Sequence, residues 1–151
     1  MQKFNLFFIV RLLLGLLYVS SGIEKLMQPY ENFVYVLQGY DIVHNYTLER
    51  IAAFFFPWIE FFLGVFLLLG LWIKLCLWGY SVLSLTFIVV VSQAIVRKLQ
   101  IDNCGCFGDL VHMPLHAVII LDVGVLVLAF VLYKKINLSS YFSLDHYYSK
   151  R

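Results

Sequence analysis

The chain has 151 residues, of which 62% are hydrophobic and only 13% are charged, and its formal net charge is +2. Soluble domains usually contain about a quarter charged residues, so this composition excludes a water-soluble globular protein. The small net charge argues against a nucleic-acid partner. The mean hydropathy of +0.87 indicates an integral membrane protein in contact with the lipid bilayer. The length fits a single domain, residues 1–151.

Four segments are apolar for the roughly 20 residues that a helix needs to cross a bilayer. They cover about residues 4–27, 50–72, 75–96 and 115–133, and an aromatic and polar tail follows at 136–151. Only Ile73 and Lys74 separate the second segment from the third, so these two helices are expected to form a tight hairpin. The sequence therefore predicts an all-α integral membrane protein, built as a four-transmembrane-helix bundle.

The first predicted span carries small and polar residues on one face. Arg11, Gly15, Tyr18, Gly22 and Lys25 follow one another at spacings of four, three, four and three residues, which places them on one side of a helix. Small residues let a neighbouring helix approach closely, and polar residues can hydrogen-bond across such a contact. Lys25, near the predicted outer end, fits either a snorkelling interfacial residue or a group that favours a nearby thiolate.

The second and fourth predicted spans each contain a carboxylate at membrane depth. Ala53, Pro57, Glu60 and Gly64 share one face of the second span. Glu60 lies about ten residues into that span, which is near mid-membrane by helical rise, and Asp122 lies about seven residues into the fourth. A charge at this depth costs about 2.5–3.5 kcal/mol on insertion scales, so it usually faces the bundle interior and has a partner.

Arg11, Glu60 and Asp122 are therefore expected to face a common interior. One interpretation is a structural polar network that fixes the register of the helices. The other is a functional site, either a proton relay or a pocket for the polar head group of a cofactor.

The basic residues at the ends of the spans predict the orientation in the membrane. With four spans, both termini lie on one side. That side carries Lys3, Lys74, Lys134, Lys135, Lys150 and Arg151, against Lys25, Arg50, Arg97 and Lys98 on the other. This excess predicts cytoplasmic termini in a bacterial inner membrane. The long connections 28–49 and 97–114 would then face the periplasm, which is an oxidising compartment.

Cys104 and Cys106 lie in the second of these connections, separated only by Gly105. Two thiols this close can form a small, strained disulfide that is easily reduced, and glycine permits the backbone angles that such a ring needs. A stapling disulfide is expected to close a long loop instead, so the spacing predicts a redox pair. Two free cysteines in a tight turn are the alternative. Cys76, at the opposite end of the third span, is expected to be a small apolar packing residue.

A metal site is a competing interpretation of the same segment. Its ligands would be Cys104, Cys106, His112 and His116, with Met113 nearby. Two thiolates and two imidazoles can bind zinc or copper(I). However, the Cys-x-Cys spacing is tighter than in most zinc sites, and Pro114 between the two histidines is expected to mark the first turn of a helix.

Several strings of this chain resemble the MauE branch of the MauE/DoxX family. They are Arg11-Leu-Leu-Leu-Gly15, Ser21-Gly-Ile-Glu-Lys25-Leu26, Pro57-Trp-Ile-Glu60-Phe-Phe-Leu-Gly64 and Cys104-Gly-Cys-Phe-Gly-Asp109. The resemblance implies a redox-associated inner-membrane protein. MauE is associated with the maturation of the disulfide-rich methylamine dehydrogenase, beside a thioredoxin-like partner. It also implies Cys104 and Cys106 as the redox centre, with Arg11 and Glu60 as polar motif positions.

The resulting hypothesis is thiol–disulfide exchange with an extracytoplasmic partner in the maturation of exported proteins, with Cys104 favoured as the attacking residue. Four-helix disulfide-forming enzymes of the DsbB and vitamin K epoxide reductase kind use a quinone and a second cysteine pair, which this chain lacks. The chain is thus expected to be a thiol–disulfide oxidoreductase or its membrane subunit, with a quinone as the candidate electron acceptor. A non-catalytic membrane scaffold is the alternative. No nucleotide-binding glycine motif is present.

Overall fold

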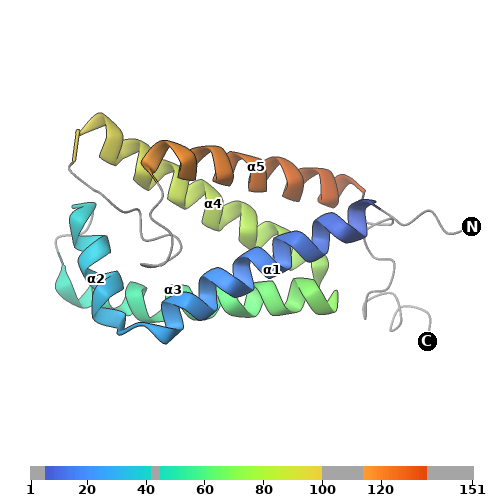
Figure 1. The fold of residues 1–151 in the computed structure, drawn as a ribbon, viewed down its shortest axis with the longest axis horizontal. Coiled ribbons are helices and arrows are strands. Elements are labelled where there is room, and N and C mark those ends of the chain that lie inside the picture. Colours follow the sequence, from blue (N-terminus) through green and yellow to red (C-terminus); the bar gives the residue numbers. More distant parts are fainter. Residues whose placement is uncertain (1–5, 42–44, 100–113, 136–151) are drawn as a thin grey trace, which may run out of the picture.

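The computed structural model describes residues 6–41, 45–99 and 114–135, and these form helices and short turns without any strand. The helices are α1 (Leu6–Met27), α2 (Tyr30–Gly39), α3 (Tyr46–Leu69), α4 (Ile73–Val96) and α5 (Leu115–Lys134) (Figure 1). Four of them, α1, α3, α4 and α5, are long and apolar enough to cross a membrane. The prediction of an all-α bundle with four transmembrane helices is therefore confirmed.

α3 begins and ends a few residues earlier than the predicted span 50–72. Asn45 caps its first turn, because its side-chain oxygen accepts a hydrogen bond from the backbone N–H of Thr47 at 3.0 Å. At the other end Gly70 adopts the left-handed conformation with φ of 68°, which terminates the helix. The connection to α4 is short, as predicted, but it consists of Gly70–Trp72, because Ile73 and Lys74 already belong to α4.

α2 is a helix that the sequence analysis missed, since the connection 28–49 was predicted as a loop. Pro29 stands at its N-cap and fixes a backbone angle that suits a helix start. Phe33 and Val34 are buried and cluster with Ala53 of α3. With only ten residues, α2 is too short to cross a bilayer. It lies beside the first turns of α3, at one end of the bundle (Figure 1).

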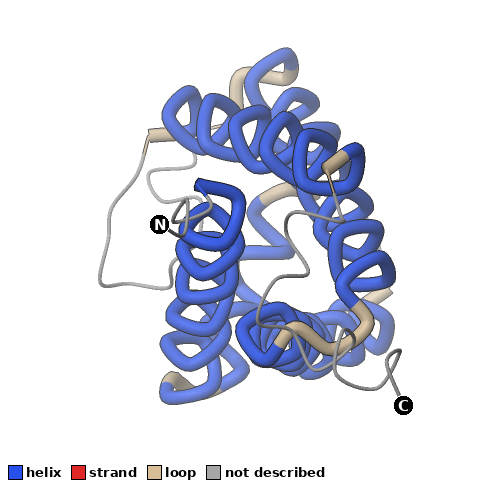
Figure 2. The backbone as a smooth tube through the Cα atoms, turned by 90° about the vertical axis from the view of Figure 1, so that its right-hand side faces the viewer, coloured by secondary structure: helices blue, strands red, loops and turns tan. Residues whose placement is uncertain are grey.

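The long helices pack mainly as two pairs, α1 with α3 and α4 with α5. Figure 2 views the bundle from one end and shows helices on all sides of a common interior. α1 and α3 approach closely at glycines: a Cβ atom added at Gly22 would lie 2.8 Å from the backbone nitrogen of Phe61, and one added at Gly64 would lie 2.8 Å from that of Val19. These glycines let the two backbones touch.

One apolar cluster joins the two pairs, and a second joins α2 to α4 and α5. The largest buries Cys76 at 1% exposure together with residues of α1, α3, α4 and α5, so the predicted packing role of Cys76 is confirmed. At the α2 end, Tyr40 packs against Val91 and Ala94 of α4 and Val118 of α5. The first turn of α1 and the last turn of α5 are both at the opposite end (Figure 1). Which end faces the cytoplasm stays a prediction.

An exposed ion pair also ties α2 to α4. Arg97, which follows α4, lies 2.6 Å from the carboxylate of Asp41 and donates a second hydrogen bond to the Asp41 carbonyl at 3.0 Å. The two side chains are 43% and 47% exposed. Exposed pairs contribute little because water screens them. We expect Arg97→Gln to lower the free energy of unfolding by about 1 kcal/mol or less, measured by thermal unfolding in detergent micelles.

Candidate functional site

A buried ion pair between α1 and α3 is the centre of the candidate site. Lys25 Nζ lies 2.9 Å from Oε1 and 2.7 Å from Oε2 of Glu60. Ser21 Oγ donates a third hydrogen bond to Oε2 at 3.2 Å. The two charged side chains are only 2% and 3% exposed. A charge pair this far from water is held by its own attraction and its hydrogen bonds.

The glycine contacts explain why the two charges meet. Gly22 lies one turn before Lys25 on the same face of α1, and its missing side chain leaves room for the backbone of Phe61, next to Glu60. All five residues predicted on that face of α1 are buried, and so are the four predicted on the face of α3. Both predicted faces are therefore confirmed, and they pack against each other.

Two aromatic rings from other helices cover the ammonium group of Lys25. The ring centroid of Phe33, on α2, is 5.3 Å from Nζ, and that of Phe87, on α4, is 5.5 Å from it. A cation over an aromatic face is attracted by the ring quadrupole, more strongly where water is absent. α2 thus closes the ion pair at one end of the bundle.

A second group of polar side chains joins α1 to α4 and α5. The hydroxyl groups of Tyr18 and Ser84 lie 3.0 Å apart, and Ser84 also makes a side-chain hydrogen bond with Asp122. Asp122 interacts electrostatically with both Glu60 and Lys25. The two groups are therefore neighbours in one buried region.

Tyr80 of α4 completes this region. Its ring centroid is 4.1 Å from that of Tyr18, and its hydroxyl interacts electrostatically with Glu60. The side chain has 0% exposure. We refer to the whole set as the polar cluster, which consists of Tyr18, Ser21, Lys25, Glu60, Tyr80, Ser84 and Asp122.

The predicted intramembrane residues thus divide into two groups. Glu60, Asp122 and Lys25 come together in the polar cluster. Arg11 also faces the interior, with 1% exposure, and its guanidinium lies 5.0 Å from the ring centroid of Phe8. However, about 20 Å of helix separates Arg11 from Lys25, so Arg11 lies toward the other end of α1. Sequence periodicity gives the face of a helix correctly here but says nothing of this difference in depth.

The predicted redox pair, Cys104 and Cys106, lies outside the described residues, as does His112. His116 is exposed on the first turn of α5, which begins directly after Pro114, as predicted. Within the ranges that the structure describes, no three His, Cys, Asp or Glu side chains are grouped to hold a metal. The cysteine and metal interpretations of this segment remain predictions.

The polar cluster also contains residues that sequence reasoning missed. Ser21, Ser84 and Tyr80 are uncharged, and the search for charges at membrane depth passed over them. Tyr80 and Ser84 are four residues apart on α4, a spacing that places them on one helix face. That spacing is the signal that could have found them.

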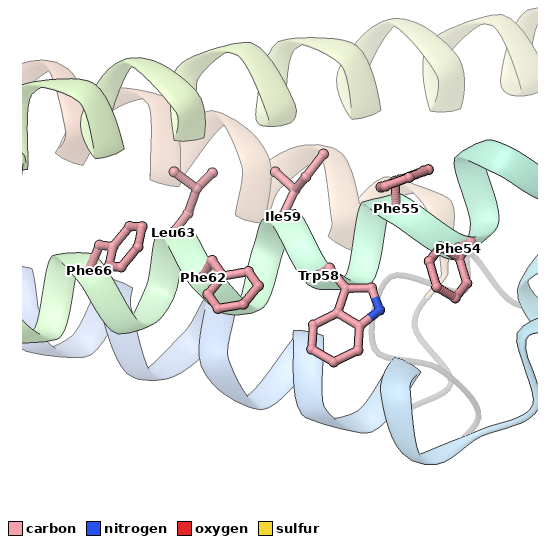
Figure 3. A pocket seen from close by; sticks show the side chains of 7 residues that line it. All are labelled: Phe54, Phe55, Trp58, Ile59, Phe62, Leu63 and Phe66. Carbon is pink, nitrogen blue, oxygen red and sulfur yellow. The ribbon is translucent and has the colours of Figure 1, made fainter.

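A groove on α3 has a different character (Figure 3). It has a volume of about 530 Å³ and is lined by Phe54, Phe55, Trp58, Ile59, Phe62, Leu63 and Phe66. These side chains cover successive turns of α3, and five of them are at least 40% exposed. In a bilayer such an apolar surface faces lipid.

Comparison with known proteins identifies one family. The family model described as "Methylamine utilisation protein MauE" matches residues 3–135 of the chain. This range contains every long helix, the polar cluster and the Cys-Gly-Cys segment. No curated protein and no solved structure matches the chain.

Proposed function

The chain belongs to the MauE family of membrane proteins, and from this membership we propose that it is a membrane-bound component of thiol–disulfide exchange that acts through Cys104 and Cys106. Its partner in this proposal is a thioredoxin-like extracytoplasmic protein, and its role lies in the maturation of exported proteins. The protein would reside in the bacterial inner membrane, with cytoplasmic termini and the Cys-Gly-Cys segment on the periplasmic side.

The observation that carries this proposal is the Cys104-Gly-Cys106 sequence in the connection between α4 and α5. The residues that flank this connection, Leu99 and Leu115, belong to one apolar cluster at the α2 end of the bundle. Both cysteines therefore belong to a segment that starts and ends at one membrane face. A soluble partner could reach a redox pair there without entering the bilayer.

The exchange balances as a transfer of two electrons and two protons. A thiolate of the partner attacks the Cys104–Cys106 disulfide and forms a mixed disulfide, which the second thiol of the partner then resolves. The partner dithiol is oxidised to a disulfide, and Cys104 and Cys106 are reduced to two thiols. A membrane-soluble quinone, reduced to the quinol, would take up these two electrons and two protons and restore the disulfide. The reverse direction uses the same steps.

Trapping experiments in intact cells test the proposal. In the reverse direction, the remaining thiolate of Cys104→Ser or Cys106→Ser attacks a partner disulfide, but no neighbouring cysteine is left to resolve the mixed disulfide. At least one variant should therefore accumulate a reductant-sensitive adduct with its partner. Alkylation-shift gels measure the adduct and the redox state of the wild-type pair. Cys76→Ala is the matched control, because Cys76 is buried, and it should behave as wild type.

Two results would contradict thiol–disulfide exchange. One is that neither single-serine variant forms an adduct while the wild-type thiols remain fully reduced. The other is that both thiols become reactive only after a chelator is added, which would favour the metal site instead.

A further inference from the structure

The charges of the polar cluster do not balance if every group is ionised. Glu60 and Asp122 supply two carboxylates, and Lys25 supplies one ammonium group. Among the residues that the structure describes, Arg11 is the only other buried cation, and about 20 Å of helix separates it from Lys25. A net charge buried at membrane depth is strongly unfavourable, so the described residues leave one carboxylate to be neutralised by another species.

We propose that Asp122 is a proton-binding site within the membrane, a carboxylic acid that carries one exchangeable proton while Glu60 remains paired with Lys25. This proposal does not rest on the cysteine chemistry. It names the proton as the ligand of the polar cluster and Asp122 as the residue that holds it.

The geometry explains why the proton belongs on Asp122 rather than on Glu60. Lys25 binds both oxygens of Glu60, at 2.9 and 2.7 Å, and Ser21 donates to the same carboxylate. Lys25 and Ser21 therefore already balance the charge and satisfy the oxygens of the Glu60 carboxylate. Among the residues that the structure describes, the hydroxyl group of Ser84 is the hydrogen-bond partner of Asp122.

Three groups face Asp122 from the neighbouring helices, and of these Ser84 and Lys25 stabilise a negative charge on Asp122 whereas Glu60 opposes it. α4 presents Ser84, α3 presents the negative Glu60, and α1 presents Lys25. The positive charge of Lys25 is already shared with Glu60. A second negative charge on Asp122 would be repelled by Glu60 in a region of low dielectric constant. The neutral acid avoids that repulsion and can donate its proton to Ser84.

The buried hydroxyl group of Tyr80 is a second observation that the polar cluster can bind a further polar species. Its side chain is fully buried, and its hydroxyl has no hydrogen-bond partner among the described residues. Buried hydroxyl groups are nearly always hydrogen-bonded. The hydroxyl interacts electrostatically with Glu60 and Tyr18, so its unused hydrogen-bonding capacity lies in the region that would receive a mobile proton.

Proton movement within the cluster would conserve charge. If the proton moves from Asp122 to Glu60, the carboxylate of Asp122 replaces that of Glu60 as the counter-ion of Lys25. Phe33 of α2 and Phe87 of α4 cover the ammonium group. A change in the position of the Lys25 ammonium group would therefore alter its contacts with these two helices. The position of one proton is thereby linked to the packing of α2.

Infrared spectroscopy of the full chain in lipid bilayers tests the proposal. A protonated carboxylic acid has a carbonyl stretching band that is separate from the carboxylate bands and shifts in D₂O. We expect this band in the wild type and its loss in Asp122→Asn. Glu60→Gln should also lose the band, because Lys25 then becomes the counter-ion of Asp122. Lys25→Met should about double it, because both carboxyl groups must then be neutral.

Glu49→Gln is the matched control, since Glu49 is a buried carboxylate outside the polar cluster whose Oε2 accepts from Gln38 at 3.1 Å. It should leave the Asp122 component of the band unchanged. A second measurement needs no substitution: carboxyl-¹³C-labelled aspartate in the wild type should shift the band, and labelled glutamate should not.

A band that survives in Asp122→Asn, or that responds to labelled glutamate only, would overturn the proposal. So would the absence of the band from the wild type in both sodium and potassium buffers. A band that appears only when these cations are removed would mean that a metal cation, rather than a proton, neutralises Asp122.

Discussion

Lys25→Met is expected to lower the free energy of unfolding by about 3–5 kcal/mol, because the buried carboxyl group of Glu60 loses its cation and must be neutralised by a proton instead. The side chains of the pair are almost fully removed from water, so solvent cannot compensate for the loss. The change also removes the group that Phe33 and Phe87 cover. Unfolding of the purified protein in detergent micelles, followed by circular dichroism, measures the effect.

The double variant Lys25→Met/Glu60→Leu separates the loss of pairing from the loss of packing. A buried ion pair and an apolar pair of similar volume are often close in stability, so the double variant should recover most of what Lys25→Met loses. Arg97→Gln, which breaks the exposed pair with Asp41, provides the reference for a weak ion pair. If Lys25→Met destabilises no more than Arg97→Gln, the pair with Glu60 is not holding α1 against α3.

Gly22→Ala is the second change with a large expected effect. The added Cβ would lie 2.8 Å from the nitrogen and 2.9 Å from the Cα of Phe61, and backbone atoms cannot move aside as a side chain can. Overpacking of this kind typically costs about 1–3 kcal/mol. The separation of α1 from α3 should also lengthen the contact between Lys25 and Glu60. Thermal unfolding in micelles measures the loss of stability.

Gly124→Ala is the matched control, because a Cβ at Gly124 of α5 meets nothing within 4 Å. Alanine is the better helix former by about 1 kcal/mol, so this variant should be neutral or slightly more stable. A Gly22→Ala protein as stable as Gly124→Ala would mean that α1 and α3 can separate without loss.

The sequence was sufficient to predict the spans and the buried faces. Each long helix contains an 18-residue stretch of high mean hydropathy, so composition is sufficient to locate the candidate spans. On α1 and α3, glycines and charges recur at helical spacing, and that spacing correctly identified the face that packs inward. These features depend only on residues near one another in the chain, which is why they could be read from it.

The polar cluster needed the fold, because its contacts join residues far apart in the chain. Ser84 contacts Tyr18 across 66 positions, and although helical spacing identified Tyr18, Ser84 carries no charge that would have marked it as a partner. Which residues lie level with one another also depends on where helices begin. Asn45 starts α3 earlier than its apolar pattern predicts. The helix therefore has more residues between its first turn and Glu60 than the sequence pattern suggested.

α2 escaped prediction for a different physical reason. It is stable through the burial of Phe33 and Val34 against α3, and isolated helices of this length are marginal in water. Its apolar residues are too few to suggest a transmembrane span. They form a buried contact only when Ala53 of α3 lies opposite them. A helix that depends on tertiary contacts in this way leaves a weak local pattern.

The pairing of α1 with α3 has a consequence for the order in which the protein is made. Chains are synthesised from the N-terminus, so Lys25 is already present when Glu60 leaves the ribosome. The two charges can neutralise each other while α4 and α5 are still missing. Asp122 is made later and joins a site whose cation is already bound. The order of synthesis and the folded structure thus both pair Lys25 with Glu60.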